Sequence, residues 1–199
     1  GAAPQDKKYR DEPTRLEIGN DNTIRECVTI NRGTVQDAGV TRVGSGNWIM
    51  AYVHIAHDCV VGDHTIFANT TNLGGHVHIG DWVILGGNSQ VHQLCKIGAH
   101  AMTGTGTVVL HDIPPYVMAS GNTAGAHGIN SEGLRRRGFD PEAINAIRRA
   151  YKTLYKSGLT LDEARSQLAA QAKDPANPHR EAVALLSDFL GSVTRGIVR

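Results

Sequence analysis

An apolar residue recurs at every sixth position along a large part of this chain. Between Val43 and Val109, eleven of the twelve positions spaced six residues apart are apolar, and the exception is Thr103. Glycine follows seven of these twelve positions, at Gly44, Gly62, Gly74, Gly80, Gly86, Gly98 and Gly104. Because an α-helix buries one face with a period of 3.6 residues, a period of six does not fit a helical stripe. The repeat therefore indicates extended structure.

The six-residue unit predicts a coil with three flat sides. Its fifth residue and the first residue of the next unit are two apart, so their side chains share one face of a strand, and the third and fourth residues are left to turn a corner. Three sides close a coil of 18 residues, and stacked coils pair their backbones in parallel ladders. Apolar residues followed by glycine recur at this spacing: Val43, Val61, Ile79 and Ile97. We therefore expect a mainly β fold, a parallel β-helix.

The repeat has one interruption and one end. From Gln36 to Arg42 there are seven residues where the frame requires six, which predicts a loop ejected from a corner. The frame stops at Asp112-Ile113-Pro114-Pro115, because proline has no N–H to donate to a ladder. We assign residues 1–120 to the β-helix and residues 121–199 to a helical C-terminal domain. The polar residues 1–15 and the lack of an initiator Met predict that earlier coils precede this chain.

Helix start signals support the second domain. Asp140-Pro141-Glu142 is typical of a helix N-terminus, with Asp as the cap and Pro at the first helical position. Thr160-Leu161-Asp162-Glu163 is a capping box, in which the first and last side chains bond each other's backbone N–H. A third helix is expected over Pro178 to Leu190.

Charge and cysteine content exclude several classes of protein. The formal net charge of +1 gives no general attraction to nucleic acid, and the sequence lacks the basic stretches with interleaved aromatics that would bind it. No uninterrupted apolar stretch approaches the ~18 residues of a membrane span. The three cysteines lack the paired spacing of a zinc site, which favours free thiols in a reducing compartment, the cytoplasm.

Histidines supply the candidate chemistry. His57 and Asp58 occupy the third and fourth positions of their unit, at a corner, and counting 18 and 36 residues onward places Gly75 and Gln93 on the same edge. An imidazole with a carboxylate beside it is suited to general-base catalysis. A bare glycine backbone one coil away can offer an N–H to an oxyanion. A solvated corner with no function is the simpler alternative.

Other residues also allow more than one interpretation. His54, His57 and His76 could converge on zinc, which often takes three histidines. Cys59 and Cys95 fall at the inward fifth position, where packing is expected. Trp48 and Trp82 fall at outward or corner positions and are expected to contact solvent or another subunit. The basic run from Arg135 to Arg137 predicts a solvated helix face or a site for phosphates or an acidic partner.

Beyond the repeat itself, several motifs resemble one family throughout the chain, the bacterial UDP-N-acetylglucosamine O-acyltransferases that begin lipid A synthesis. The matching stretches are Pro4-Gln5-Asp6 with Lys8, residues 24–30, His54-Ile55-Ala56-His57-Asp58-Cys59, Gly75-His76-Val77, Val91-His92-Gln93, Pro114-Pro115-Tyr116-Val117, Glu132-Gly133-Leu134 and Arg136-Arg137-Gly138-Phe139. The hexapeptide repeat is common to many acyltransferases, whereas residues 54–59 followed by this helical domain are specific.

The resemblance implies a homotrimer of left-handed parallel β-helices, with active sites in clefts between adjacent subunits. It implies transfer of an (R)-3-hydroxyacyl group from acyl carrier protein to the glucosamine 3-hydroxyl of UDP-N-acetylglucosamine. The donor arrives on the phosphopantetheine of its carrier, so no separate cofactor is expected. Two alternatives stay open: a zinc-dependent γ-class carbonic anhydrase-like enzyme, and the N-acyltransferase of the same pathway.

The resemblance also implies roles for individual residues. His57 matches the general base, Asp58 the residue that orients or polarises its ring, and Gly75 the donor of an N–H to the oxyanion. The matches to substrate-binding positions are Asp6, Lys8, His54, His76, His92 and Gln93, and in the nucleotide-binding segment Asn130, Glu132, Arg136 and Arg137. No protein ligand to a metal is implied. Asn31 stands where many relatives have a histidine, so no role is carried to it.

Overall fold

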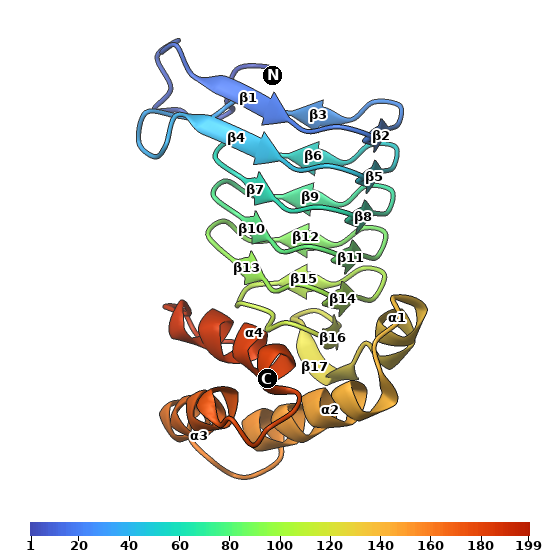
Figure 1. The fold of residues 1–199 in the computed structure, drawn as a ribbon. Helices are drawn as coiled ribbons and strands as arrows, with labels where there is room; N and C mark the ends of the chain where they lie inside the picture. The colour runs from blue at the N-terminus through green and yellow to red at the C-terminus, as the bar shows by residue number, and fades with distance from the viewer.

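The computed structural model describes residues 1–199 and consists of a β-helix followed by four helices (Figure 1). The first sheet of the β-helix contains β1 (Arg15–Ile18), β4 (Val40–Val43), β7 (Val60–Val61), β10 (His78–Ile79) and β13 (Lys96–Ile97). The second contains β2 (Thr23–Ile24), β5 (Trp48–Ile49), β8 (Ile66–Phe67), β11 (Ile84–Leu85), β14 (Met102–Thr103), β16 (Val117–Ser120) and β17 (Gly125–Ile129). The third contains β3 (Thr29–Ile30), β6 (His54–Ile55), β9 (Asn72–Leu73), β12 (Gln90–Val91) and β15 (Val108–Val109).

The expected 18-residue coil is confirmed by the strand pairing. Val43 pairs with Val61, Val61 with Ile79 and Ile79 with Ile97, all in parallel register, so the four residues form one column. Their side chains are at most 3% exposed and point into the coil, whereas Ile18 and Ile24, the first positions of two earlier units, are 43% and 41% exposed. The fold is the left-handed parallel β-helix implied by the resemblance, and its six-residue units alternate inward and outward side chains on three flat sides.

The interruption of the repeat lengthens the first coil, which is measured by the number of residues between paired positions of neighbouring strands. Ile18 pairs with Val43, so the two residues are 43 − 18 = 25 positions apart, which is one coil of 18 plus seven. The extra residues form a turn at residues 35–38. The prediction of a loop from Gln36 to Arg42 is wrong at its end, since β4 already begins at Val40 and pairs with β1.

Corners of the coil turn through a left-handed residue. The fourth residue of the unit has positive φ at Asp58 (59°), His76 (60°), Trp82 (62°) and His100 (63°). This conformation is uncommon for residues with a Cβ and is most frequent for Asn, Asp and His. The backbone conformation at the corner is therefore tightly constrained. The third and fourth side chains lie outside the coil, where they can contact a ligand or pack against other side chains.

The inside of the coil is filled by small and branched side chains. Cys59 and Cys95 are 0% and 1% exposed, so the packing role expected for them is confirmed, whereas Cys27 is exposed. Burial raises the pKa of the Cys59 thiol to about 12 and that of the Cys95 thiol to about 11. Both thiols are therefore protonated at neutral pH and unreactive.

The C-terminal helices close the end of the β-helix. They are α1 (Ser131–Arg136), α2 (Pro141–Tyr155), α3 (Leu161–Lys173) and α4 (Arg180–Gly191). The capping box at Thr160 and Glu163 is formed, whereas Asp140 makes no capping hydrogen bond although Pro141 begins α2 as expected. The division of domains at residue 120 stays a prediction, because the antiparallel hairpin of β16 and β17 spans it. None of the helices is both long and apolar enough to cross a membrane.

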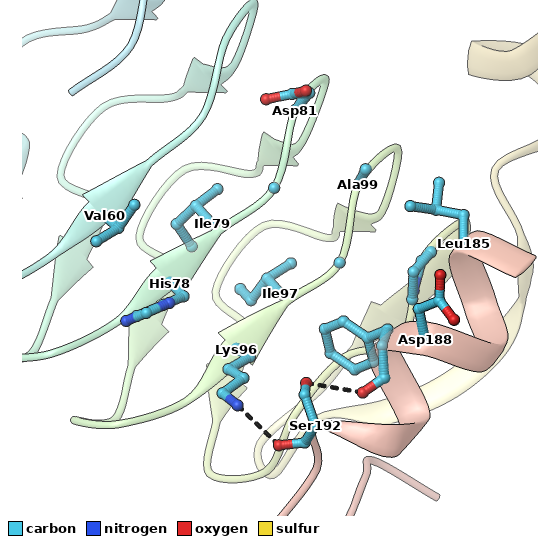
Figure 2. A pocket seen from close by; sticks show the side chains of 14 residues that line it. Val60, His78, Ile79, Asp81, Lys96, Ile97, Ala99, Leu185, Asp188 and Ser192 are labelled. Atoms are coloured by element: carbon cyan, nitrogen blue, oxygen red, sulfur yellow. Dashed lines mark hydrogen bonds between the residues drawn. The ribbon is translucent and has the colours of Figure 1, made fainter. Parts of the chain in front are cut away.

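Helix α4 packs beside the last coils of the first sheet. A cavity of about 530 Å³ lies between them and is lined by side chains of β7, β10, β13 and α4 (Figure 2). The Lys96 ammonium crosses this space and donates to the Ser192 carbonyl at 2.7 Å. The contact joins the β-helix to the end of α4.

Candidate active site

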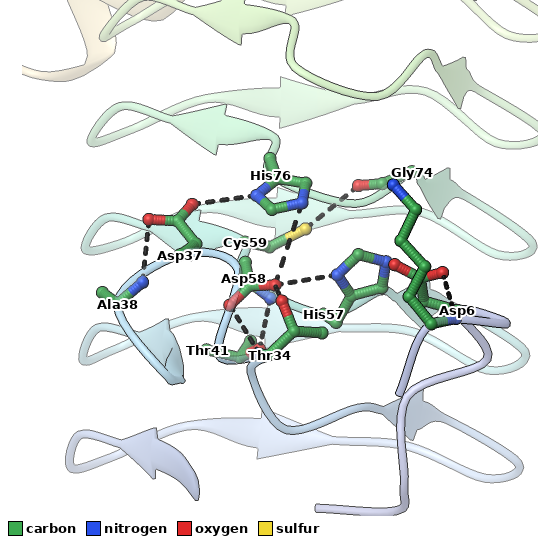
Figure 3. A network of polar contacts seen from close by, with 11 residues as sticks. Asp6, Thr34, Asp37, Ala38, Thr41, His57, Asp58, Cys59, Gly74 and His76 are labelled. Carbon is green, nitrogen blue, oxygen red and sulfur yellow. Dashed lines mark hydrogen bonds and ion pairs between the residues drawn. The ribbon is translucent and has the colours of Figure 1, made fainter. Parts of the chain in front are cut away.

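His57 and Asp58 form a hydrogen-bonded pair at the corner between β6 and β7. The distance from His57 Nδ1 to Asp58 Oδ2 is 2.8 Å (Figure 3). Because a carboxylate oxygen only accepts, this contact fixes the imidazole proton on Nδ1 and leaves Nε2 with a lone pair. The His57 side chain is 14% exposed. The sequence thus folds into a base whose proton-accepting nitrogen is set by its neighbour.

Asp58 is held in place by donors from the preceding coil. Its carboxylate accepts hydrogen bonds from the Thr34 N–H at 2.8 Å and the Thr34 hydroxyl at 2.6 Å, and its own N–H donates to Thr41 Oγ1 at 2.8 Å. The side chain is 1% exposed. A buried carboxylate needs this number of donors to offset its desolvation. Its oxygen is therefore fixed relative to the His57 ring.

Gly75 is a glycine because the His57 ring occupies the space of a side chain. A Cβ at position 75 would lie 2.6 Å from His57 Cε1 and 2.7 Å from Nε2, closer than side-chain atoms approach. No group of the chain accepts a hydrogen bond from the Gly75 N–H. A free N–H on the residue against which the His57 ring packs can stabilise a developing oxyanion.

His76 lies one coil from Asp58, on the same edge. Its Nδ1 is 2.8 Å from Asp37 Oδ2, and its Nε2 is 3.8 Å from Asp58 Oδ2. The rings of His57 and His76 meet edge to face, with centroids 5.1 Å apart and an interplanar angle of 89°. Asp37 belongs to the extra turn of the first coil, so its part in this network was missed by the sequence analysis.

Of the three histidines predicted to converge on zinc, the structure brings His57 and His76 together but not His54. The group whose possible ligand atoms all lie within 4.8 Å of one another is His57, Asp58 and His76. His54 is outside this group, and its Nδ1 is 2.7 Å from the hydroxyl of Thr29. Within the group, the Asp58 oxygens already accept from His57 and Thr34. Hydrogen bonds within the chain therefore account for the arrangement.

Two adjoining cavities surround the pair. The first, of about 580 Å³, is lined by six of the residues singled out from the sequence, namely Asp6, Lys8, His54, His57, His76 and Gln93. The second, of about 370 Å³, contains His92 and shares His54 and Ala56 with the first. The first cavity is mostly polar, whereas Val108 and Leu110 give the second an apolar side. Burial lowers the pKa of His54, so its ring is neutral at pH 7.

Residues of the predicted nucleotide-binding segment lie elsewhere. Helix α1, which Asn130 caps, lies across the molecule from the corner between β6 and β7 (Figure 1). Neither cavity is lined by Asn130, Glu132, Arg136 or Arg137. Asn130 is buried, caps α1 by accepting from the Gly133 N–H at 3.1 Å, and donates to the His100 carbonyl at 3.1 Å. The structure does not bring this segment to His57.

A column of stacked rings lies on the edge near α1. His64 and Trp82 stack at 4.4 Å, and the rings of Trp82, His100 and Tyr116 follow at 6.5 and 5.7 Å. The Arg137 guanidinium lies 5.4 Å from the Trp82 ring centre and donates to the Trp82 carbonyl at 3.0 Å. The sequence analysis missed this column, although the 18-residue spacing of its first three members was a signal for it.

Comparison with known proteins gives one consistent result. A family model described as UDP N-acetylglucosamine O-acyltransferase, domain 2, matches residues 112–198, and one described as bacterial transferase hexapeptide matches residues 41–75. An acyl-[acyl-carrier-protein]–UDP-N-acetylglucosamine O-acyltransferase from Thiobacillus denitrificans is 63% identical over all of this chain and 75% of its own length. A relative with the same name from Janthinobacterium is 59% identical over all of this chain and 76% of its own length.

Solved structures agree with the sequence relatives. LpxA from Acinetobacter baumannii is 52% identical, has a TM-score of 0.94, and is matched over 100% of this chain and 76% of that one. An acyltransferase from Francisella novicida is 42% identical, with a TM-score of 0.95, over 100% of this chain and 71% of that one. Neither the carbonic anhydrase nor the N-acyltransferase alternative is supported by these relatives. The chain is an enzyme that belongs to the UDP-N-acetylglucosamine O-acyltransferase family.

Proposed function

We propose that this enzyme transfers an (R)-3-hydroxyacyl group from acyl carrier protein to the glucosamine 3-hydroxyl of UDP-N-acetylglucosamine, the first step of lipid A synthesis. The observation that carries the proposal is the contact of His57 with both Asp58 and Gly75. This corner offers a base and an oxyanion donor within one small space, and acyl transfer to a hydroxyl requires both.

The reaction follows from these positions. Nε2 of His57 takes the proton of the sugar hydroxyl as its oxygen attacks the thioester carbonyl. The carbonyl oxygen becomes an oxyanion, which the free N–H of Gly75 stabilises. Collapse of the tetrahedral intermediate breaks the carbon–sulfur bond, and the leaving thiolate takes the proton from the His57 imidazolium. Asp58 stabilises that imidazolium through the bond to Nδ1.

The two adjoining cavities support the assignment of substrate contacts. Asp6, Lys8, His54, His76 and Gln93 line the larger, polar cavity, which suits a sugar with several hydroxyls. His92 lines the second cavity, whose apolar side suits the pantetheine arm or the acyl chain. The donor supplies its own phosphopantetheine, so the proposal includes no further cofactor.

A homotrimer is part of the proposal and has its own support. The outward residues of the second sheet form one apolar column in which each side chain pairs with the next: Trp48, Ile66, Ile84, Met102 and Met118. Trp48 and Met118 are 46% and 38% exposed in the single subunit. A continuous apolar face of this kind is typical of a subunit interface. Association would bring Asn130, Glu132, Arg136 and Arg137 of one subunit towards the His57 corner of another, where they would contact the nucleotide.

The second domain supports the assignment of the acyl donor. Exposed basic side chains follow one another along α2 and its C-cap, at Arg148, Arg149, Lys152 and Lys156. Acyl carrier protein is acidic, so this surface offers it charge complementarity. The three free cysteines support a reducing compartment, and we assign the enzyme to the cytoplasm.

Release of the carrier thiol tests the function directly. We expect purified enzyme to release thiol from (R)-3-hydroxyacyl carrier protein only when UDP-N-acetylglucosamine is present, with one acylated sugar nucleotide formed per thiol. Thiol release at the same rate without the sugar nucleotide would contradict the proposal, because it would identify a hydrolase rather than a transferase.

A further inference from the structure

We propose that Asp37 is a positioning residue that acts through His76 on the His57–Asp58 pair. This inference deepens the proposed function and rests on it, because it assigns Asp37 a role in the same base. Asp37 stands in the extra turn of the first coil, 39 residues before His76, and does not line either cavity of the site.

The contact between Asp37 and His76 fixes the proton of the His76 ring. Asp37 Oδ2 is 2.8 Å from His76 Nδ1, and the other carboxylate oxygen of Asp37 accepts from the Ala38 N–H at 2.8 Å. The hydrogen bond from His76 lowers the pKa of Asp37, so the group is an ionised acceptor at neutral pH. Nδ1 of His76 must then be the donor.

The orientation of His76 follows from that donor. With Nδ1 directed at Asp37, Nε2 is directed at Asp58 Oδ2, 3.8 Å away (Figure 3). The same Asp58 oxygen accepts from His57 Nδ1. Two carboxylates and two imidazoles thus alternate in the order Asp37, His76, Asp58, His57. Rotation of the His76 ring would move its Nε2 away from Asp58 Oδ2. It would also change the edge-to-face contact between the rings of His76 and His57.

The exposure of Asp58, His57 and His76 shows why His76 needs Asp37 as a partner. Asp58 and His57 are 1% and 14% exposed and are held by several contacts, whereas His76 is 23% exposed and has Asp37 as its one hydrogen-bond partner. A partly exposed imidazole without a partner samples several rotamers and both neutral tautomers. The titratable groups near His76 are Asp37 from the extra turn, Asp58 and His57 from the corner, and His78 from β10.

The test compares Asp37→Ala with Asp37→Asn. We expect Asp37→Ala to lower kcat about tenfold, the loss typical of one hydrogen bond to a charged group, with KM for UDP-N-acetylglucosamine changed less than twofold. Asp37→Asn keeps an oxygen acceptor and is expected to recover most of this loss. Asp188→Ala, which removes an exposed carboxylate from α4, is the matched control and is expected to leave kcat unchanged.

Two further measurements show whether Asp37 acts through His76. In a His76→Ala background, Asp37→Ala is expected to cause less than a twofold additional loss. Nitrogen NMR of wild type is expected to show His76 protonated at Nδ1, and Asp37→Ala is expected to move this proton to Nε2. The tautomer is read without turnover, so it tests the contact even if the proposed acyl transfer fails. An unchanged tautomer, a kcat for Asp37→Ala within twofold of wild type, or a full tenfold loss in the His76→Ala background would overturn the inference.

Discussion

Two edges of the β-helix have the same backbone turn but carry different side-chain arrangements. At the edge with His57, the corner residues Asp58 and His76 carry a network of hydrogen bonds beside open cavities. At the edge near α1, the corner residues Trp82 and His100 belong to a column of stacked rings. Both edges place their fourth residues at φ of about 60°. The coil therefore supplies positions, and the side chains at those positions decide between a polar network beside a cavity and a packed column.

Histidine itself shows the difference between the edges. His57 keeps a carboxylate partner and faces a cavity, whereas His100 is packed between Trp82 and Tyr116. Burial, with a smaller contribution from the nearby Arg137, lowers the pKa of His100 to about 4. His100 is thus neutral at pH 7, but its ring is engaged in stacking with Trp82 and Tyr116. The neighbouring side chains, rather than the residue type itself, distinguish the two histidines.

Substitution of His57 is expected to have the largest effect of any change at these edges. His57→Ala should lower kcat about a thousandfold, as expected for loss of a general base, because it removes the imidazole whose Nε2 is left free by the bond to Asp58. The measurement is steady-state thiol release dependent on UDP-N-acetylglucosamine. His64→Ala removes an exposed histidine from the opposite edge and should keep kcat within twofold of wild type. Equal losses in both variants would contradict the distinction between the edges.

Glycine at the catalytic edge gives a sharper comparison. Gly75→Ala should lower kcat by up to about a hundredfold, because the new Cβ would displace the His57 ring from its position. Gly87→Ala is the matched control, since Gly87 is the third residue of its own corner and a Cβ there would make an ordinary contact of 3.5 Å with the Asn69 carbonyl. If both variants keep wild-type kcat, the close packing of Gly75 against His57 is not needed for catalysis.

The regular part of this molecule could be predicted from its sequence, and the irregular part could not. The column of Val43, Val61, Ile79 and Ile97 follows from counting, because every coil repeats the same length. Counting also placed Gly75 next to His57. The position of Asp37 could not be predicted from the repeat. The first coil is seven residues longer than the regular coils, and no later coil has equivalent residues that would show where these seven fold.

Residues of the C-terminal domain show a second limit. Asn130 was assigned to nucleotide binding on resemblance, and the structure shows its side chain engaged by the His100 carbonyl and the Gly133 N–H. Its role in the nucleotide site stays a prediction. A single sequence carries no spacing rule between α1 and the corner of His100, so a contact between two different kinds of structure was not predictable from periodicity.

Removal of Trp82 tests the packing edge. Trp82→Ala should lower the free energy of unfolding by about 2 kcal/mol, because it removes two stacking contacts and the cation–π contact with Arg137. Urea unfolding followed by circular dichroism measures the change. Trp82→Phe keeps an aromatic ring in the column and should recover most of the loss. A Trp82→Ala variant as stable as wild type would show that the column contributes nothing to stability.

The pH dependence of stability tests whether the pKa of His100 is lowered in the folded protein. Its ordinary pKa of 6.5 applies to the unfolded chain, and the pKa in the folded protein is lowered to about 4. Between these values the unfolded chain binds more protons, so this residue's contribution to stability is complete above pH 6.5 and is lost as the pH falls towards 4. His100→Phe keeps a ring in the column but cannot titrate. Allowing for the partial exposure of the ring, wild type should lose about 1–2 kcal/mol more than the variant over this range. Parallel stability curves for the two proteins would mean that His100 is protonated as easily in the folded column as in water, and the packing edge would then be as open to solvent as the catalytic one.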